Sequence, residues 1–575
     1  MADGITDLSV KEQPEICISC TCFSQTSANV EVEISDGHIR GRQLLTERKT
    51  PYFAFQDIPY AKPPVGDLRF KEPVKPEKWE GVLNSTENRR VCIQFSDPSD
   101  PRETEDCLVL NVYTPVNSEK LGTHELAVLV WIHGGSFRRW FGAMDSFGPD
   151  YFIDKNVIVV TLNYRLGPLG FLTTNDGVIP ANNGLKDQHL ALKWVNENIE
   201  VFGGDPAKVT IAGQSAGAAS VGYHVMSKKS AGLFRAAIMQ SACPLTCWSL
   251  QKYPEDAAKL LGSNLKWNSR VLSKLLSATK NISSDDLLKK LQSASIADLK
   301  KYSDINLQVP LSKKNCHAFT SLTWTPVIEN EEDENALVTG MSHENIKEGN
   351  INRVPVLMGI NSEESLLFGA QNIQLQCSLF DPSLKLMITG NLRMEEGNKR
   401  PAGYSIKNLY TKSLFSMDRA ASVNLISDMV FAIPTARHAH LQSNYTDVYF
   451  YKFSHLGKLG RLVNETVPGA EGVAHQEEIE YLFRSSNNRD MSKFPEEDRI
   501  THDRLVTMWS QFVKHLNPTK GKNELLQNIV WPKVTPQDFF YLDINTTLAV
   551  AKDLKNFRQY EKIYSSYAEE KLFTY

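Results

Sequence analysis

The hydrophobic positions of the chain follow two different patterns. Residues Val30–Ile34 alternate apolar and acidic side chains, Gly37 then permits a turn, and the chain returns through Ile39. This alternation is typical of a half-exposed strand and predicts a β-hairpin. The runs Leu126–Ile132 and Val157–Leu162 are continuous instead. Continuous apolar runs of this length predict strands that are buried on both faces of a parallel sheet.

Helical segments separate the strand-like runs. His189–Phe202 places Leu192 and Val195 on one face of a predicted helix, and two more strand-like runs follow at Val354–Ile360 and Val448–Phe453. Alternation of strands and helices predicts an α/β fold, with a central, mostly parallel sheet flanked by helices.

The domain organisation is predicted to be simple. Residues 1–29 have the composition of a poorly ordered leader, and residues 243–351 are helical, charged and irregular. Ile500–Leu516 has the pattern of an amphipathic helix that ends before Pro518. We find no internal repeat and no linker rich in Pro, Gly or Ser. The sequence therefore predicts one domain, residues 30–575, with large helical insertions.

The bulk composition excludes several function classes. The 575 residues are 41% hydrophobic and 23% charged, and the formal net charge is −4, which gives no electrostatic basis for binding nucleic acid. No apolar run approaches the length of a membrane span. The first residues lack the apolar core of a signal peptide. We therefore expect a cytoplasmic protein, monomeric or homodimeric, with secretion as the alternative.

The cysteines and the glycosylation sequons bear on that alternative. Of the nine cysteines, Cys92 and Cys107 would close a short loop if they were joined by a disulfide. Such a bond would not persist in a reducing cytosol. The cluster of Cys17, Cys20 and Cys22 lacks a partner pair at zinc-finger spacing, so we expect free thiols there and no bound metal. Sequons lie at Asn84, Asn281, Asn444, Asn464 and Asn545.

The motif that indicates a catalytic function is Gly213–Gly217, of sequence Gly-Gln-Ser-Ala-Gly. It follows the β-branched run Val209–Ala212 and precedes Ala218–Met226, which can form a helix. A serine between two glycines at a tight strand-to-helix turn is the signature of a nucleophile elbow. We therefore expect Ser215 to be a nucleophile.

A nucleophilic serine needs a base and an orienting carboxylate. His475 lies in the glycine-flanked loop Gly472–Glu478, after the predicted strand Val448–Phe453. Glu363 and Glu364 both follow the strand before it. One of them would orient the imidazole, and the other is expected to be a solvated loop charge. Serine, acid and histidine then occur in the α/β-hydrolase order.

An oxyanion hole needs backbone amides that point at the developing negative charge. His133–Phe137 contains two consecutive glycines directly after a buried strand. The expected donors are the amides of Gly135 and Ser136, together with the amide of Ala216 after the nucleophile.

These motifs sit in a longer pattern. The segments Phe55–Ala61 and Pro63–Phe70, then Glu105–Leu108, Asn163–Gly167 and Phe202–Pro206, resemble the signatures of type B carboxylesterases, the family that also contains the cholinesterases. The resemblance covers nearly the whole chain from about Val30.

The resemblance implies an α/β-hydrolase fold and ester hydrolysis through an acyl-enzyme, without a metal or other cofactor. It assigns the acid to Glu364 instead of Glu363. It also implies the disulfide Cys92–Cys107 and the structural ion pairs Arg69–Glu105 and Arg165–Asp187.

Three departures from the family concern the substrate. Ser136 stands where glycine is common, Gln214 replaces the usual glutamate before the nucleophile, and Ser365 replaces a glycine. The loop between Cys92 and Cys107 contains no tryptophan. Without that ring and that carboxylate, the site lacks the usual attraction for choline.

We therefore expect a serine carboxylesterase for uncharged, hydrophobic esters. It resembles the intracellular insect esterases that act on xenobiotic and dietary esters, with organophosphate or pyrethroid detoxification as a possible role. Gln214 also resembles the residue found in juvenile hormone esterases, which is the alternative. An inactive adhesion homologue is disfavoured because all three triad residues are present. An esterase that is acylated quickly and deacylates slowly stays open. The substrate pockets are expected mainly in residues 243–351 and in loops near Phe137 and Trp248.

Overall fold

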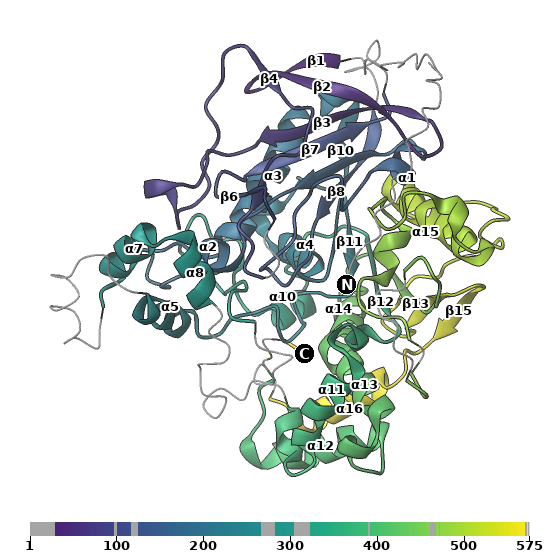
Figure 1. The fold of residues 1–575 in the computed structure, drawn as a ribbon. Helices are drawn as coiled ribbons and strands as arrows, with labels where there is room; N and C mark the ends of the chain where they lie inside the picture. The colour runs from purple at the N-terminus through teal and green to yellow at the C-terminus, as the bar shows by residue number, and fades with distance from the viewer. Residues whose placement is uncertain are drawn as a thin grey trace, which may run out of the picture.

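One mixed sheet runs through the computed structural model (Figure 1). The structure describes residues 29–96, 100–116, 125–265, 282–303, 322–388, 392–460, 467–470, 472–569, 572 and 574–575. The sheet has 13 strands in the order β1-β2-β3-β7-β9-β8-β10-β11-β12-β13-β14-β15, and β4 pairs with β2. Their bounds are β1 Asn29–Ile34, β2 Gly37–Leu45, β3 Pro51–Pro59, β4 Val82–Asn84, β7 Val109–Thr114, β8 Leu126–Ile132, β9 Ile158–Leu162, β10 Gly204–Gln214, β11 Ala236–Gln240, β12 Val356–Asn361, β13 Val448–Phe453, β14 Phe540–Ile544 and β15 Leu548–Lys552.

The centre of the sheet is parallel and its two ends are antiparallel. All pairs from β9 through β8, β10, β11, β12 and β13 to β14 are parallel. The pairs β1–β2, β2–β3, β3–β7, β7–β9 and β14–β15 are antiparallel. The predicted hairpin at Gly37 and the predicted mostly parallel α/β sheet are therefore confirmed. A separate pair joins β5 (Val91–Cys92) to β6 (Glu103–Thr104).

Helices cover both faces of the sheet. Their bounds are α1 Asp150–Ile153, α2 Gly167–Phe171, α3 Asn183–Asn198, α4 Ala216–Met226, α5 Pro254–Asn264, α7 Ser284–Ser293, α8 Ile296–Ser303, α10 Ser342–Glu348, α11 Ala370–Cys377, α12 Glu396–Tyr410, α13 Arg419–Ser427, α14 Ile433–Gln442, α15 Glu496–His515 and α16 Phe557–Tyr567. In Figure 1, α5, α7 and α8 form one lobe beside the sheet, and α11, α12, α13 and α16 form another. No helix in the described ranges is long and apolar enough to cross a membrane.

The continuous apolar run in β8 is buried on both sides. Val128, Val130 and Ile132 belong to one hydrophobic core, which also contains residues of α3, α4 and α14. Leu129 and Trp131 belong to a second core, which contains residues of α1 and α15. Because successive side chains of a strand point to opposite faces, a strand between two cores has no polar face. This explains why β8 shows no alternation of apolar and polar residues.

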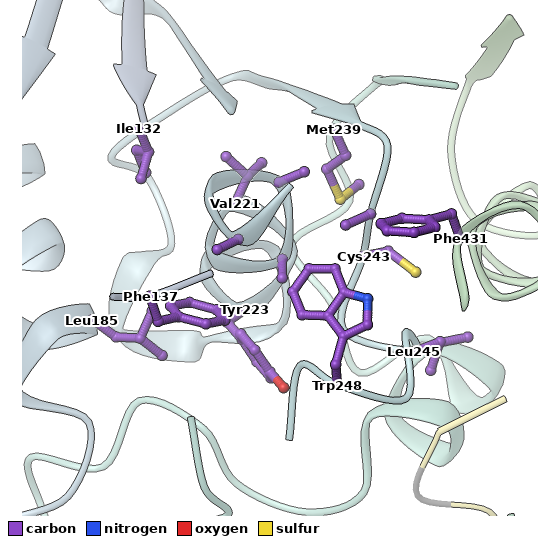
Figure 2. Packing of buried hydrophobic residues seen from close by; sticks show 14 of the residues in the cluster. Ile132, Phe137, Leu185, Val221, Tyr223, Met239, Cys243, Leu245, Trp248 and Phe431 are labelled. Carbon is purple, nitrogen blue, oxygen red and sulfur yellow. The ribbon is translucent and has the colours of Figure 1, made fainter. Parts of the chain in front are cut away.

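Helix α4 begins directly after β10 and is almost completely buried. All of its residues except Met226 are buried. Figure 2 shows its Val221 and Tyr223 among side chains from other elements, including Ile132, Met239 and Phe137. A helix held on all sides in this way fixes the position of the turn that precedes it.

The structure differs from the sequence expectations mainly at element boundaries. The helix expected at His189–Phe202 begins earlier, at Asn183, and ends in a 3₁₀ turn, Ile199–Phe202. The last long helix begins at Glu496 instead of Ile500. Asn29, the last residue of the predicted leader, is the first residue of β1. The predictions for the rest of the leader, for Cys17, Cys20 and Cys22, and for the sequons at Asn281 and Asn464 lie outside the described residues.

Candidate active site

The turn between β10 and α4 holds Ser215 in an unusual backbone conformation. Its φ is 57° and its ψ is −124°, a region that non-glycine residues rarely adopt. A Cβ on Gly213 would lie 2.5 Å from the carbonyl atoms of Gly217, and a Cβ on Gly217 would overlap the carbonyl oxygen of Ile132. Both glycines are therefore required for the turn, as the elbow motif predicts.

His475 and Glu364 meet at the carboxyl ends of two neighbouring strands. Glu364 follows β12 and His475 follows β13, and the carboxylate Oε2 lies 2.5 Å from the imidazole Nδ1. The Glu364 side chain is fully buried, and its Oε1 accepts a hydrogen bond from the Asn361 amide at 2.8 Å. The His475 amide donates to the Glu364 carbonyl at 3.2 Å. Side chain and backbone thus hold the two residues together.

The neighbouring glutamate has a different role from the one expected. Glu363 is buried, with 4% of its surface exposed, so the expectation of a solvated loop charge is wrong. Its Oε2 accepts hydrogen bonds from the amides of Gly472 at 2.7 Å and Val473 at 3.4 Å. These bonds hold the loop that carries His475. The Glu363 carboxylate is buried because the loop amides need a hydrogen-bond acceptor, and leaving a buried amide without one costs free energy of folding.

The second ring nitrogen of His475 contacts Gln214 instead of the serine. Gln214 Nε2 lies 3.0 Å from His475 Nε2. With Nδ1–H donated to Glu364, Nε2 is the acceptor for this amide, which is the tautomer that a general base needs. No hydrogen bond of the Ser215 hydroxyl to another described residue is found. The amide therefore occupies the lone pair to which the serine would donate.

The turn after β8 presents free amides. Gly135, Ser136 and Phe137 all have positive φ values, 95°, 57° and 56°. The Gly135 carbonyl accepts from the amides of Arg138 at 2.9 Å and Arg139 at 3.0 Å. Among the described residues, neither the Gly135 amide nor the Ser136 amide has an acceptor. Three consecutive left-handed residues leave these donors unpaired, as an oxyanion hole requires.

These groups meet at a largely apolar cavity of about 250 Å³, called the inner cavity below. None of its described lining residues is acidic. Its lining consists of Gly135, Ser136, Arg139, Ser215, Trp248, Leu322, Leu367, Phe368, Asn372, Gln376, Val430, Phe431, His475 and Gln476.

Phe431 is the apolar lining residue of the inner cavity that packs against His475. Its ring centroid lies 4.7 Å from that of His475 and 6.2 Å from that of Trp248. Figure 2 shows Phe431 and Trp248 on the same side of α4. An apolar wall beside the imidazole excludes water from the base and gives an uncharged group a place to bind.

A third buried carboxylate, Glu478, lies near the pair formed by His475 and Glu364. Glu478 is fully buried, and it accepts from Asn361 Nδ2 at 2.6 Å and from Gln240 Nε2 at 3.1 Å. Burial, and then the charge of Glu364, raise the pKa of Glu478 to about 7. Sequence reasoning missed this group, although it belongs to the quoted loop, because nothing in the sequence distinguishes it from Glu477.

Comparison with known proteins identifies the family. The family model for the carboxylesterase family matches residues 28–561. The chain belongs to the carboxylesterase family. It is 33% identical to juvenile hormone esterase of Tribolium castaneum, over 88% of this chain and 86% of that protein. It is 30% identical to venom carboxylesterase-6 of Apis mellifera, over 92% of each. The crystal structure of juvenile hormone esterase from Manduca sexta superposes with a TM-score of 0.79 at 27% identity, covering 94% of this chain and 99% of that one.

This carboxylesterase is therefore a carboxylic ester hydrolase with an α/β-hydrolase fold. The structure joins Cys92 and Cys107 in a disulfide. Gln94, inside that loop, is hydrogen-bonded to Trp140, which follows the Gly135–Phe137 turn: its Oε1 accepts from the Trp140 backbone amide at 2.5 Å, and its Nε2 donates to the Trp140 carbonyl at 3.1 Å. The disulfide loop thus braces the segment that carries the free amides.

The two ion pairs implied by the resemblance lie next to the same loop. Arg69 contacts both carboxylate oxygens of Glu105, at 2.6 and 2.5 Å. Arg165 contacts both oxygens of Asp187, at 2.8 and 2.6 Å, and this pair is almost fully buried. Bidentate pairs fix orientation as well as charge, so both anchor the segments that surround the carboxylesterase site.

Proposed function

We propose that the protein hydrolyses carboxylic esters through an acyl-enzyme on Ser215. The serine oxygen attacks the ester carbonyl, and its proton passes to His475 Nε2. Glu364 stabilises the imidazolium that forms. The amides of Gly135, Ser136 and Ala216 bind the oxyanion. The imidazolium then protonates the departing alcohol, and water attacks the acyl-enzyme with His475 again acting as base.

One observation supports this proposal above the others. Ser215 and His475, and the donors Gly135 and Ser136, line the same cavity, although they come from three separate strand ends. Glu364 comes from a fourth strand end and contacts the histidine. In open α/β sheets, ligands bind at the carboxyl ends of the parallel strands. For catalysis the Gln214 amide must leave His475 Nε2 when the substrate binds, so that the serine hydroxyl can donate there.

The cavity lining favours esters whose reacting end is hydrophobic. Trp248, Phe368, Phe431 and Val430 supply apolar surface, and no described lining residue is acidic. Gln214 is neutral, so this position offers a cation no counter-charge. We therefore propose esters of xenobiotic or dietary type over choline esters, with organophosphates as inhibitors that phosphorylate the same serine.

A second candidate is the hydrolysis of juvenile hormone. Both a sequence relative and a solved structure carry that activity in their names, and Gln214 is the residue that suggested it from the sequence. In the solved relative, a compound designated OTFP is covalently attached, which is in keeping with covalent catalysis in this family.

The deciding experiment compares kcat/KM for a short-chain naphthyl ester with that for juvenile hormone. A higher value for the naphthyl ester supports the first candidate, and a higher value for juvenile hormone supports the second. A burst of product followed by a very slow steady rate would identify a sequestering esterase. Hydrolysis of neither ester would refute the proposed function.

The cytoplasmic location stays a prediction, and three observations favour the secreted alternative. The Cys92–Cys107 disulfide is typical of an oxidising compartment. The sequons at Asn84, Asn444 and Asn545 all lie at exposed positions. A venom carboxylesterase is among the relatives. Treating the protein purified from its native tissue with a glycosidase tests secretion, because a fall in mass on gel electrophoresis shows that the sequons were used.

A further inference from the structure

Next to the inner cavity lies a larger cleft of about 610 Å³, called the outer cleft below. The two share Gly135, Ser136, Arg139 and Leu322 as lining residues, so they adjoin at these four residues. The outer cleft is lined by Phe95, Ser96, Gly135, Ser136, Arg138, Arg139, Lys300, Lys301 and Leu322.

The lining of the outer cleft is cationic. Four of its nine residues are arginine or lysine, and none of these nine is acidic. Arg139 and Lys301 are exposed, and neither forms an ion pair with another described residue. Lys300 is neutralised by Glu103, whose carboxylate lies 2.5 Å from its ammonium. The uncompensated charge therefore comes mainly from Arg139 and Lys301.

The cations come from two segments that are far apart in the sequence. Arg138 and Arg139 directly follow the Gly135–Phe137 turn, and their backbone amides donate to the Gly135 carbonyl. The side chain of Arg138 donates to the Phe95 carbonyl at 2.8 Å. Lys300 and Lys301 lie on α8. In Figure 1, α8 belongs to the lobe beside the sheet. The helical insertion thus adds its charges to a cleft whose other wall holds the proposed oxyanion donors.

The junction of the two spaces determines how an ester lies in them. Gly135 and Ser136 line both the inner cavity and the outer cleft. An ester whose carbonyl oxygen rests on their amides can therefore place one arm among the apolar residues of the inner cavity and the other arm in the outer cleft.

We propose that the outer cleft binds an ionised carboxylate at the far end of that second arm. The substrate class is then an amphipathic ester, with an apolar group next to the reacting carbonyl and a carboxylate remote from it. A guanidinium matches a carboxylate in shape and charge, and a cleft of one sign of charge attracts anionic ligands from solution. The inference rests on the proposed function and refines the expectation of an uncharged substrate.

The test uses two pairs of esters that differ only in charge. The first pair is the 4-nitrophenyl ester of suberic acid with a free terminal carboxylate, and the same ester with a terminal primary amide. The second pair is 4-carboxyphenyl butyrate and 4-carbamoylphenyl butyrate, in which the charge lies on the alcohol. Each amide is a neutral isostere of its partner, so the kcat/KM ratio within a pair measures recognition of the charge.

The wild-type protein should have a roughly three- to tenfold higher kcat/KM for the carboxylate than for the amide at low salt, which is the effect expected of two exposed charges. We expect this preference for one of the two pairs, the one whose charged arm enters the outer cleft. The preference should shrink at about 0.5 M NaCl because of screening. The double variant Arg139→Gln/Lys301→Gln should lose it. The matched variant Lys412→Gln/Lys522→Gln removes two exposed lysines that line neither space, and it should keep the preference.

The outcomes separate this inference from the proposed function. If the neutral amide esters are not hydrolysed, the proposed function fails. If they are hydrolysed but neither pair shows a preference for the carboxylate, only the inference about the outer cleft is overturned. A preference that survives in the Arg139→Gln/Lys301→Gln variant also overturns it, because the charge is then recognised elsewhere.

Discussion

Glu363 and Glu364 are adjacent, so matched substitutions can test which of them is the triad acid. Glu364 contacts the imidazole Nδ1 of His475 at 2.5 Å, whereas the Glu363 carboxylate accepts from the loop that carries the histidine and from the Ser362 hydroxyl. Both are buried. Replacing each with glutamine preserves shape and removes one charge, so the two variants differ only in which neighbour loses its carboxylate.

The expected magnitudes follow from the contacts of each residue. In Glu364→Gln, the amide oxygen can still accept from the Asn361 amide, and the NH₂ group then faces His475 Nδ1. The imidazole of His475 must then carry its proton on Nε2 instead of Nδ1. In that tautomer Nε2 can no longer take a proton from Ser215. A triad with the wrong tautomer loses about 10⁴ in turnover, or roughly 5 kcal/mol of transition-state stabilisation.

In Glu363→Gln, the amide oxygen can still accept from the amides of Gly472 and Val473, and no proton of the reaction is involved. We expect this variant to keep kcat within about tenfold of the wild type. The small loss reflects weaker hydrogen bonds from the loop to a neutral acceptor.

The assay is steady-state hydrolysis of a 4-nitrophenyl ester, with circular dichroism to show that both variants are folded. A loss of about 10³-fold or more in Glu364→Gln alone supports the assignment. Equal losses in the two variants, or a larger loss in Glu363→Gln, would refute the reasoning and move the acid to Glu363.

Three further predictions concern the surroundings of the triad. Burial raises the pKa of Glu478 from 4.5 to about 7, so the folded protein holds this proton longer than the unfolded chain. Relative to Glu478→Gln, the free energy of unfolding of the wild type should therefore fall by up to about 3 kcal/mol between about pH 5 and about pH 8. Urea unfolding across this range measures it, and parallel pH profiles would contradict it. In Gln214→Glu, a carboxylate replaces the amide that contacts His475, and kcat/KM for a choline ester should rise about tenfold relative to its neutral 3,3-dimethylbutyl isostere. An unchanged ratio would show that this position does not set charge preference. Replacing Cys92 and Cys107 with alanine should lower the free energy of unfolding by about 3 kcal/mol, as expected for a closed loop of this length, and a smaller change would show that the loop is held by its other contacts.

The sequence predicts the frame of the site well because backbone geometry leaves local signals. The elbow at Ser215 requires glycines on both sides, and the oxyanion turn at Gly135 follows a continuous apolar run. Both signals lie within a few residues of the position that they predict. The parallel centre of the sheet is equally visible, because strands buried on both faces cannot alternate.

What the sequence could not predict depends on contacts between distant segments. The buried position of Glu363 follows from amides more than a hundred residues later in the chain. The contact between Gln214 and His475 joins residues that are 261 positions apart. Neither leaves a pattern in the local sequence.

The lining of the inner cavity also depends on contacts between distant segments. The pockets are expected mainly in residues 243–351 and in loops near Phe137 and Trp248, and the described part of 243–351 supplies Trp248 and Leu322. Much of the remaining apolar wall comes instead from Leu367, Phe368 and Phe431, beyond that region. Which loops close over a site depends on packing between insertions, and periodicity within one segment does not record it.

The central claim is that Ser215 forms the acyl-enzyme. Rapid mixing with a 4-nitrophenyl ester, followed by acid quenching and peptide mass spectrometry, measures this directly. We predict that the acyl adduct maps to the peptide that contains Ser215. In Ser215→Ala the adduct should be absent, and turnover should fall by at least about three orders of magnitude. An adduct on another residue, or hydrolysis that survives in Ser215→Ala, would contradict the account.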